Sequence, residues 1–284
     1  MAQLFVNDIK FLRFIPMKKK SEAPSTLLEL IQGIGIPSVL RTDGAKELHL
    51  GKWNDICDDL GIKQTITEPY SPWQNHAKIN IREAKKAIHR LMTRNKTPKA
   101  PWDYCATYVA EITCITANDL CALHGGTPYE MVTGNTPDIS EYVEFIWYDP
   151  VFYYDDTPFP QGKHILAQWL SVAHQVGQAM CYWLLTQTGQ VIARTSVQNL
   201  TLDELFSPDI KQAIHDFDIS VHDILKSHEI RDDNPTSYLQ DVYDDLDEPF
   251  DEKLTMPEQD EYPDHNTYDQ YLSTHVLLPR GDHF

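Results

Sequence analysis

The chain has 284 residues, of which 42% are hydrophobic, and its formal net charge is −18. This apolar fraction supports a packed core and excludes disorder of the whole chain. No run of 18 apolar residues occurs, and the N-terminal stretch does not have the pattern of a signal peptide. We therefore expect no membrane partner, and a nuclear or cytoplasmic protein that is not secreted. Five cysteines without a C-x-x-C pair fit reduced thiols.

The charge is distributed unevenly along the chain. Residues 1–100 have 17 Lys and Arg against 10 Asp and Glu, a net charge of +7, whereas residues 101–200 have −8 and residues 201–284 have −17. A basic front followed by an acidic remainder suggests a part that faces nucleic acid and a solvated tail. Charge blocks of this kind can equally be ordinary solvated faces.

The first third of the chain alternates between strand and helix patterns. Short apolar runs with turn signals predict strands, and longer amphipathic runs predict helices. The predicted strands are 3–6, 11–17, 38–41 and 62–67, and the predicted helices are 22–32 and 49–60. Strands that alternate with helices indicate an α/β fold with a parallel or mixed sheet.

Two long helices are predicted next. Over residues 76–95 the cations Lys78, Arg82, Lys85 and Lys86 fall within about a quarter-turn, while the apolar residues form a separate stripe. Residues 102–120 are apolar almost all round, which predicts a buried helix, and residues 129–132 predict a short one.

From about residue 145 the pattern becomes β-like. Short runs rich in Trp and Tyr at 145–154, 164–173, 180–186 and 191–195, separated by turn signals, predict a small β-barrel. From about residue 208 the sequence is Asp-rich and punctuated by Pro, which is typical of a linker. We therefore expect three parts: an α/β domain over 1–140, a barrel over 145–205, and a largely disordered acidic linker over 206–284.

Several segments resemble one family. The strings RTDGAKEL (41–48) and SPWQNHAKINIREAKKAI (71–88) are similar to the integrase core of copia-type LTR retrotransposons. ALHGGTPYEMVTGNTPDI (122–139) resembles the segment after that core, and VGQAMCYWLLTQTGQVIARTSVQNLT (176–201) resembles the small β-domain that follows. HVLLPRGDHF (275–284) resembles the stretch before reverse transcriptase in the same Gag-Pol polyprotein. The resemblance covers essentially the whole chain.

The resemblance implies an RNase-H-like fold, followed by a small SH3-like barrel, and metal-dependent DNA strand transfer. In such enzymes three carboxylates hold two Mg²⁺ or Mn²⁺ ions that activate the nucleophile and stabilise the in-line transition state. Asp43 matches the second Asp. The family's Glu corresponds to the position of Lys78, 34 intervening residues later, so a cation stands where a ligand is expected.

The first Asp of the family lies on a strand before the hairpin that corresponds here to residues 3–17. We therefore expect a core that lacks its first, central strand, with two half-sheets that leave a gap or move together. Glu83 lies five residues after Lys78, which on a helix is about 140° of rotation, so it should point away from Asp43. We expect at most weak metal binding at Asp43 and no bound cofactor.

The resemblance also implies a DNA interface. The expected contacts are Lys78 and Arg82, together with Trp73, Gln74, Asn75, Lys85, Lys86 and Arg90. Each has a plainer alternative: Asp43 as a turn former, the cations as a solvated face, and Asn75 as a helix cap. The aromatic residues of the β-domain favour core positions over base-stacking platforms. His215, His222 and His228 lack convincing metal-site spacing.

These patterns together predict a truncated, retrotransposon-derived integrase fragment that binds DNA nonspecifically through its backbone and is catalytically inactive. A second copy of the chain is a further expected partner. The alternatives are an active integrase completed by another chain, and a host-recruited DNA-binding module without catalysis.

Overall fold

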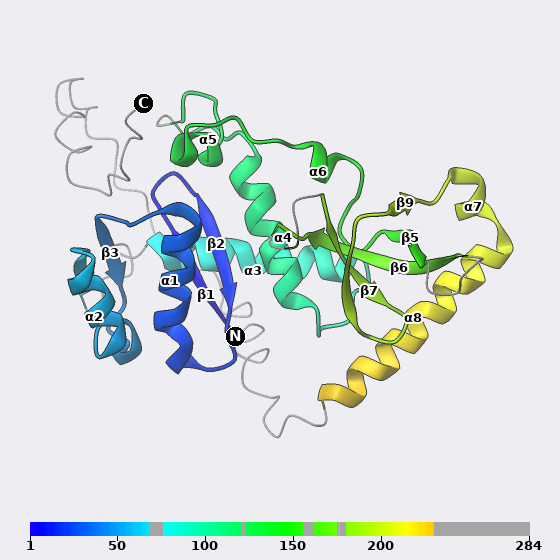
Figure 1. Ribbon diagram of the computed structural model, residues 1–284, viewed down its shortest axis with the longest axis horizontal. Helices are drawn as coiled ribbons and strands as arrows, with labels where there is room; N and C mark the ends of the chain where they lie inside the picture. The colour runs from blue at the N-terminus through cyan, green and yellow to red at the C-terminus, as the bar shows by residue number, and fades with distance from the viewer. Residues whose placement is uncertain (69–75, 121–122, 156–161, 175, 177–179, 230–284) are drawn as a thin grey trace, which may run out of the picture.

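The computed structural model describes residues 1–68, 76–120, 123–155, 162–174, 176 and 180–229 (Figure 1). The chain begins with an antiparallel hairpin, β1 (Ala2–Val6) and β2 (Leu12–Pro16). Asn7 makes the turn between them, because its side-chain oxygen accepts hydrogen bonds from the backbone N–H groups of Ile9 and Phe11 at 3.2 and 2.9 Å. The turn predicted after residue 6 is therefore confirmed.

A small α/β unit follows the hairpin. Its elements alternate in the predicted order: α1 (Ala23–Ile34), β3 (Val39–Thr42), α2 (Lys52–Asp59) and β4 (Lys63–Ile66), with 3-10 turns at Lys20–Glu22 and Lys46–Leu48. Gly51, at φ 60°, precedes α2, so that helix starts later than residue 49. β3 and β4 pair in parallel, as the alternation predicts.

The hairpin and the β3–β4 pair remain separate sheets. The described strands form one two-stranded sheet of β1 and β2 and another of β3 and β4, and no described strand joins them. The sequence predicts two half-sheets that either leave a gap or move together. In the structure the hairpin does not pair with β3, so the two half-sheets stay apart.

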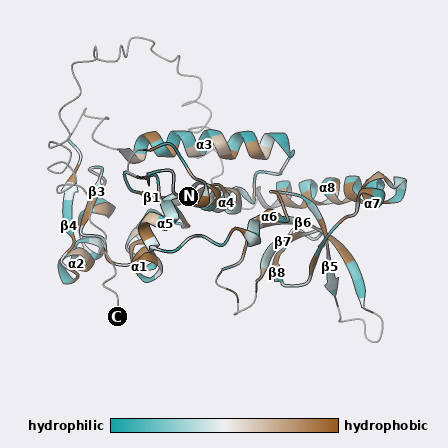
Figure 2. Ribbon diagram, turned by 90° about the horizontal axis from the view of Figure 1, so that it is seen from above, coloured by the Kyte–Doolittle hydropathy of each residue, from teal (hydrophilic) through white to brown (hydrophobic). Residues whose placement is uncertain are grey.

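Helices enclose the hairpin on both faces. On one face Phe5 stacks on Trp53 of α2, with ring centroids 6.4 Å apart, and joins a core that includes Leu27. On the other face Leu4 and Leu12 pack against α4 (Trp102–Ile115). The result is a three-layered α/β arrangement, in which α3 (His76–Arg94) runs along one side of the molecule (Figure 2).

α4 is shorter than predicted. It ends at Ile115, because Thr116 takes an extended conformation and Asn118 forms a local turn by accepting the N–H of Leu120 at 3.0 Å. Two short helices, α5 (Pro128–Thr133) and α6 (Ser140–Val143), lead to the second half of the chain. No helix among the described residues combines the length and apolar character needed to cross a membrane.

The second half contains a five-stranded antiparallel sheet in the order β8-β7-β6-β5-β9. Its strands are β5 (Pro150–Asp155), β6 (Lys163–Val172), β7 (Tyr182–Thr186), β8 (Val191–Arg194) and β9 (Val197–Asn199). β5 begins later than predicted because Tyr148, at φ 65°, interrupts extended backbone. The described strands show no pairing between the edges β8 and β9, so the predicted closed barrel stays a prediction.

The prediction of a disordered linker from residue 206 is wrong for the stretch up to residue 229. A short helix, α7 (Leu202–Phe206), and a 22-residue helix, α8 (Pro208–Glu229), occupy these positions. α8 forms because Phe217, Val221 and Leu225 recur at a spacing of four, and all three are buried against the sheet core. Residues 230–284 of the predicted linker lie outside the described residues.

Candidate nucleic-acid interface

The basic helix predicted over residues 76–95 is α3, and its two faces have different surroundings. Ala84 is buried, Ile81 packs against the hairpin core, and Ile88 and Leu91 pack against the core that contains α8. α3 contacts β1 and α4 on this apolar side. Because the apolar stripe is fixed in two cores, the basic stripe is held on the opposite, solvent-facing side.

The cations on that side differ in exposure. Lys78, Arg82 and Arg90 are exposed, while Lys85 and Lys86 are half-buried. These five are the described members of the predicted interface, and one helix brings all of them to one surface. Trp73, Gln74 and Asn75 lie outside the described residues.

Glu83 is the acidic residue within this surface, and it is occupied by its neighbours. Its Oε1 atom lies 3.3 Å from Lys86 Nζ and 3.6 Å from Arg82 Nε, and its side chain is 57% exposed. Exposed pairs of this kind contribute at most about 1 kcal/mol, so they orient the side chains more than they stabilise the helix. The surface keeps a net positive charge.

Asp43 follows β3 and has the geometry of a turn residue. Its Oδ1 atom accepts a hydrogen bond from the backbone N–H of Ala45 at 3.2 Å, and the residue is exposed. This is the plainer alternative given above, and the structure confirms that the turn role is filled.

The described part of the chain does not contain the carboxylate cluster that the resemblance implies for a two-metal site. Among the described residues there is no group of three or more His, Cys, Asp or Glu that could hold a metal ion. A two-metal centre needs several carboxylates around a shared point. A weak metal site at Asp43 therefore stays a prediction.

One polar cluster has no counterpart in the sequence patterns. Tyr142 Oη donates to Glu111 Oε2 at 3.0 Å and lies 2.9 Å from His174 Nε2, which is 3.5 Å from Glu111 Oε1. On its other side His174 Nδ1 lies 3.5 Å from Glu141 Oε2. The cluster joins α4, α6 and the segment after β6. About thirty residues separate Glu111 from the neighbouring Glu141 and Tyr142, and about thirty more separate these from His174, so no local motif could have identified the cluster.

The aromatic residues of the sheet are mainly core residues, as predicted. Trp147 and Trp169 are fully buried, and Tyr148, Tyr153 and Tyr182 are each at most 7% exposed. Tyr154 is the clear exception, with 46% of its surface exposed. The described cysteines are also buried and free, and burial raises the pKa of Cys105 to about 12.

Fold and surface together define an α/β chain with one basic helix face and a separate antiparallel sheet. No family model matches the sequence, and no curated protein matches it. Among solved structures, a chain of the simian T-cell lymphotropic virus intasome in complex with the PP2A regulatory subunit B56 gamma is 18% identical, with a TM-score of 0.36. That match covers 70% of this chain and 74% of the other. The catalytic core domain of BIV integrase is 15% identical, covering 47% of this chain and 91% of the other, with a TM-score of 0.35.

Proposed function

We propose that this chain is the integrase region of a copia-type retrotransposon polyprotein, acting as a nonspecific DNA-binding module without strand-transfer activity. The observation that carries the proposal is the division of α3 into an apolar face held in two cores and a basic face turned outward. The ordered motifs at 41–48, 71–88 and 122–139 support the family assignment.

The basic face suits a phosphate backbone better than a base edge. Lys78, Arg82, Lys85 and Lys86 recur along successive turns, so the helix presents a row of positive charge. Such a row neutralises phosphates and releases counterions, which gives affinity without sequence preference. No described loop or side chain from another element is needed for this mode of binding.

Binding should be measured with the full chain on a duplex of mixed sequence, by fluorescence anisotropy over a series of salt concentrations. The variants Arg82→Ala and Arg90→Ala should weaken binding. They should lower the slope of log affinity against log salt concentration by about 1 to 2, because each phosphate contact contributes about 0.9 to that slope. Lys226→Ala removes an exposed charge from α8 and is the matched control. If Arg82→Ala and Arg90→Ala show the same salt slope as the wild type and the control, α3 does not bind DNA.

The lack of catalysis is proposed from the ligand positions. Lys78 stands where the family has its Glu, and Glu83 is engaged by Lys86 and Arg82. Loss of metal ligands removes transition-state stabilisation that the reaction requires. Joining of a donor DNA end to a target in Mg²⁺ or Mn²⁺, abolished by Asp43→Asn, would contradict this part of the proposal.

A completed enzyme is the second candidate, and the separation of the β1–β2 and β3–β4 sheets favours it. A strand supplied by another chain between these sheets would restore the five-stranded order implied by the resemblance. Strand-transfer assays with and without a supplied partner segment distinguish the two candidates.

The acidic C-terminal part should oppose DNA binding. Residues 230–284 have 15 acidic and 3 basic residues, a net charge of −12. A truncation that tests this should begin at residue 230, because α8 belongs to the folded sheet core. Removing 230–284 should raise affinity at low salt, because like charges on protein and DNA repel each other over about a Debye length. If the chain binds DNA with equal affinity with and without residues 230–284, the acidic segment does not oppose DNA binding.

A further inference from the structure

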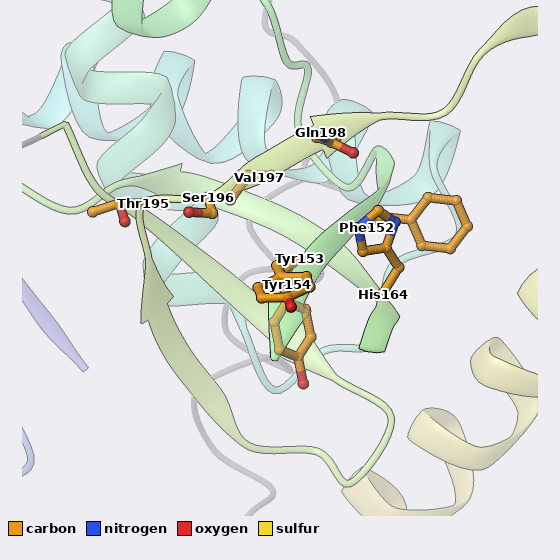
Figure 3. Close-up of a pocket in the computed structure, with 8 residues that line it drawn as sticks. All are labelled: Phe152, Tyr153, Tyr154, His164, Thr195, Ser196, Val197 and Gln198. Carbon is orange, nitrogen blue, oxygen red and sulfur yellow. The ribbon is translucent and has the colours of Figure 1, made fainter. Parts of the chain in front are cut away.

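A ring-lined hollow of about 350 Å³ opens on the β5–β6–β9 side of the sheet (Figure 3). It lies where β9 pairs with β5, at one edge of the five-stranded order, and away from α3 in the chain. Four of its lining residues have aromatic or imidazole rings, and four are small or amide residues. They are Phe152, Tyr153, Tyr154, His164, Thr195, Ser196, Val197 and Gln198.

Three of the rings form a continuous wall. The Tyr154 ring meets His164 almost perpendicularly, at 82° and 5.7 Å between centroids, and Phe152 lies 6.4 Å from His164 on its other side. Residues 152 and 154 share one face of β5, and His164 is the cross-strand partner of Tyr154. Tyr154 keeps 46% of its surface exposed, so ring surface remains available in this wall for a cation–π contact.

One ring of the lining, that of Tyr153, already contacts a cation of the chain itself. The guanidinium carbon of Arg194 lies 5.6 Å from the centroid of the Tyr153 ring. Tyr153 is 7% exposed and Tyr154 is 46% exposed, so the open ring surface of the hollow belongs mainly to Tyr154.

The surrounding charge favours a positive partner. Residues 145–229, which include the sheet and the helices that follow it, have 10 acidic and 4 basic residues, a net charge of −6. Glu204 of α7 is close enough to His164 for an electrostatic interaction. A negative field of this kind attracts cations and repels polyanions, so a nucleic-acid strand is disfavoured at this side of the sheet.

We propose that this hollow binds an organic cation, namely the ammonium group of a lysine side chain presented by a basic peptide. The rings supply cation–π attraction, and Ser196 and Gln198 supply oxygen acceptors for the ammonium N–H groups. The site is independent of α3, so it gives the chain a second, protein-directed interaction whether or not α3 binds DNA.

The test is a titration of the ¹⁵N-labelled full chain, followed through the backbone amide signal of Val197 in the hollow. The probe is a short peptide with one central lysine and flanking Gly and Ser residues, and its Lys→Gln form is the neutral control. The lysine peptide should shift the Val197 signal saturably, and the glutamine peptide should not. The same peptide with a trimethylated lysine tests whether the hollow binds the methylated ammonium more tightly than the unmethylated one.

Four variants assign the effect to the hollow. Tyr154→Ala should weaken binding by about two- to fivefold, which is the range for an exposed cation–π contact, whereas Tyr154→Phe should retain most of it. Ser196→Lys places a like charge in the hollow without removing a ring and should abolish binding. Phe206→Ala removes an exposed aromatic ring on α7, outside the lining, and should leave binding unchanged.

Three results would overturn the proposal. One is equal response to the lysine and glutamine peptides, and another is full binding by Ser196→Lys. The third is saturation of the Val197 shift by a deoxynucleotide with no response to the cation, which would make the hollow a base-stacking site. Since α3 variants are not involved, failure here does not bear on the DNA-binding proposal.

Discussion

Replacing Phe217 with Ala should reveal that α8 is an integral part of the sheet core. Phe217 is 1% exposed and packs with Trp147, Leu170 and Leu185, which come from three different segments. Truncating a buried Phe leaves a cavity as well as removing apolar surface, so the free energy of unfolding should fall by about 3–5 kcal/mol. If 206–229 were a linker, the cost would be near zero.

The matched control is Ile219→Ala on the same helix. Ile219 is 49% exposed, so its truncation should lower the free energy of unfolding by less than about 1 kcal/mol. Both variants keep good helix propensity at the changed position. The pair therefore separates docking of α8 from formation of the helix.

Chemical denaturation followed by tryptophan fluorescence is a suitable assay. Trp147 and Trp169 are both fully buried beside the affected core, so they report on its unfolding. Amide exchange in β7 gives a local measure that does not assume one cooperative transition. Equal midpoints for Phe217→Ala and Ile219→Ala would refute the reasoning.

Two further predictions concern pH and the separate sheets. The hydrogen bond to Glu111 raises the pKa of His174 above 6.5, so its stabilising effect is full below pH 6.5 and is lost as pH rises through the folded-state pKa. Glu111→Gln should flatten the pH dependence of the denaturation midpoint between about pH 6 and pH 8. An unchanged pH profile would show that the cluster does not cause the loss of stability. Amide exchange should be faster in β3, one of two strands, than in β7, the second of five; equal protection would show a stable, continuous core.

Local periodicity was sufficient to predict most elements of the first half. The amphipathic repeat from 76 to 95 gave α3 with its correct buried and exposed faces, because the spacing of Ile81, Ala84 and Ile88 is itself the cause of burial. The same rule applies to α8, where Phe217 and Val221 continue a four-residue spacing. That helix was missed because acidic composition was given more weight than periodicity.

Features made by tertiary contact could not be predicted in this way. Glu111, Tyr142 and His174 meet only because α4, α6 and the end of β6 converge, and none of them carries a local signature. The hollow beside Tyr154 is similar, because its lining residues come from β5, β6, β9 and the connection before β9. Sequence patterns give the face of one element, whereas these sites depend on which faces meet.

The charge at residue 78 links the proposed loss of catalysis to the proposed gain of DNA binding. A carboxylate there would lie at the start of α3 and shorten its basic row, whereas Lys78 extends that row to the first turn of the helix. Glu83 cannot restore the ligand, because about 140° of rotation separates it from Lys78 and its oxygen is held by Lys86 and Arg82. On this proposal, the lysine at the position that the resemblance assigns to a metal ligand also makes the helix a more uniform phosphate-binding surface. Lys78→Glu should therefore weaken DNA binding without restoring strand transfer.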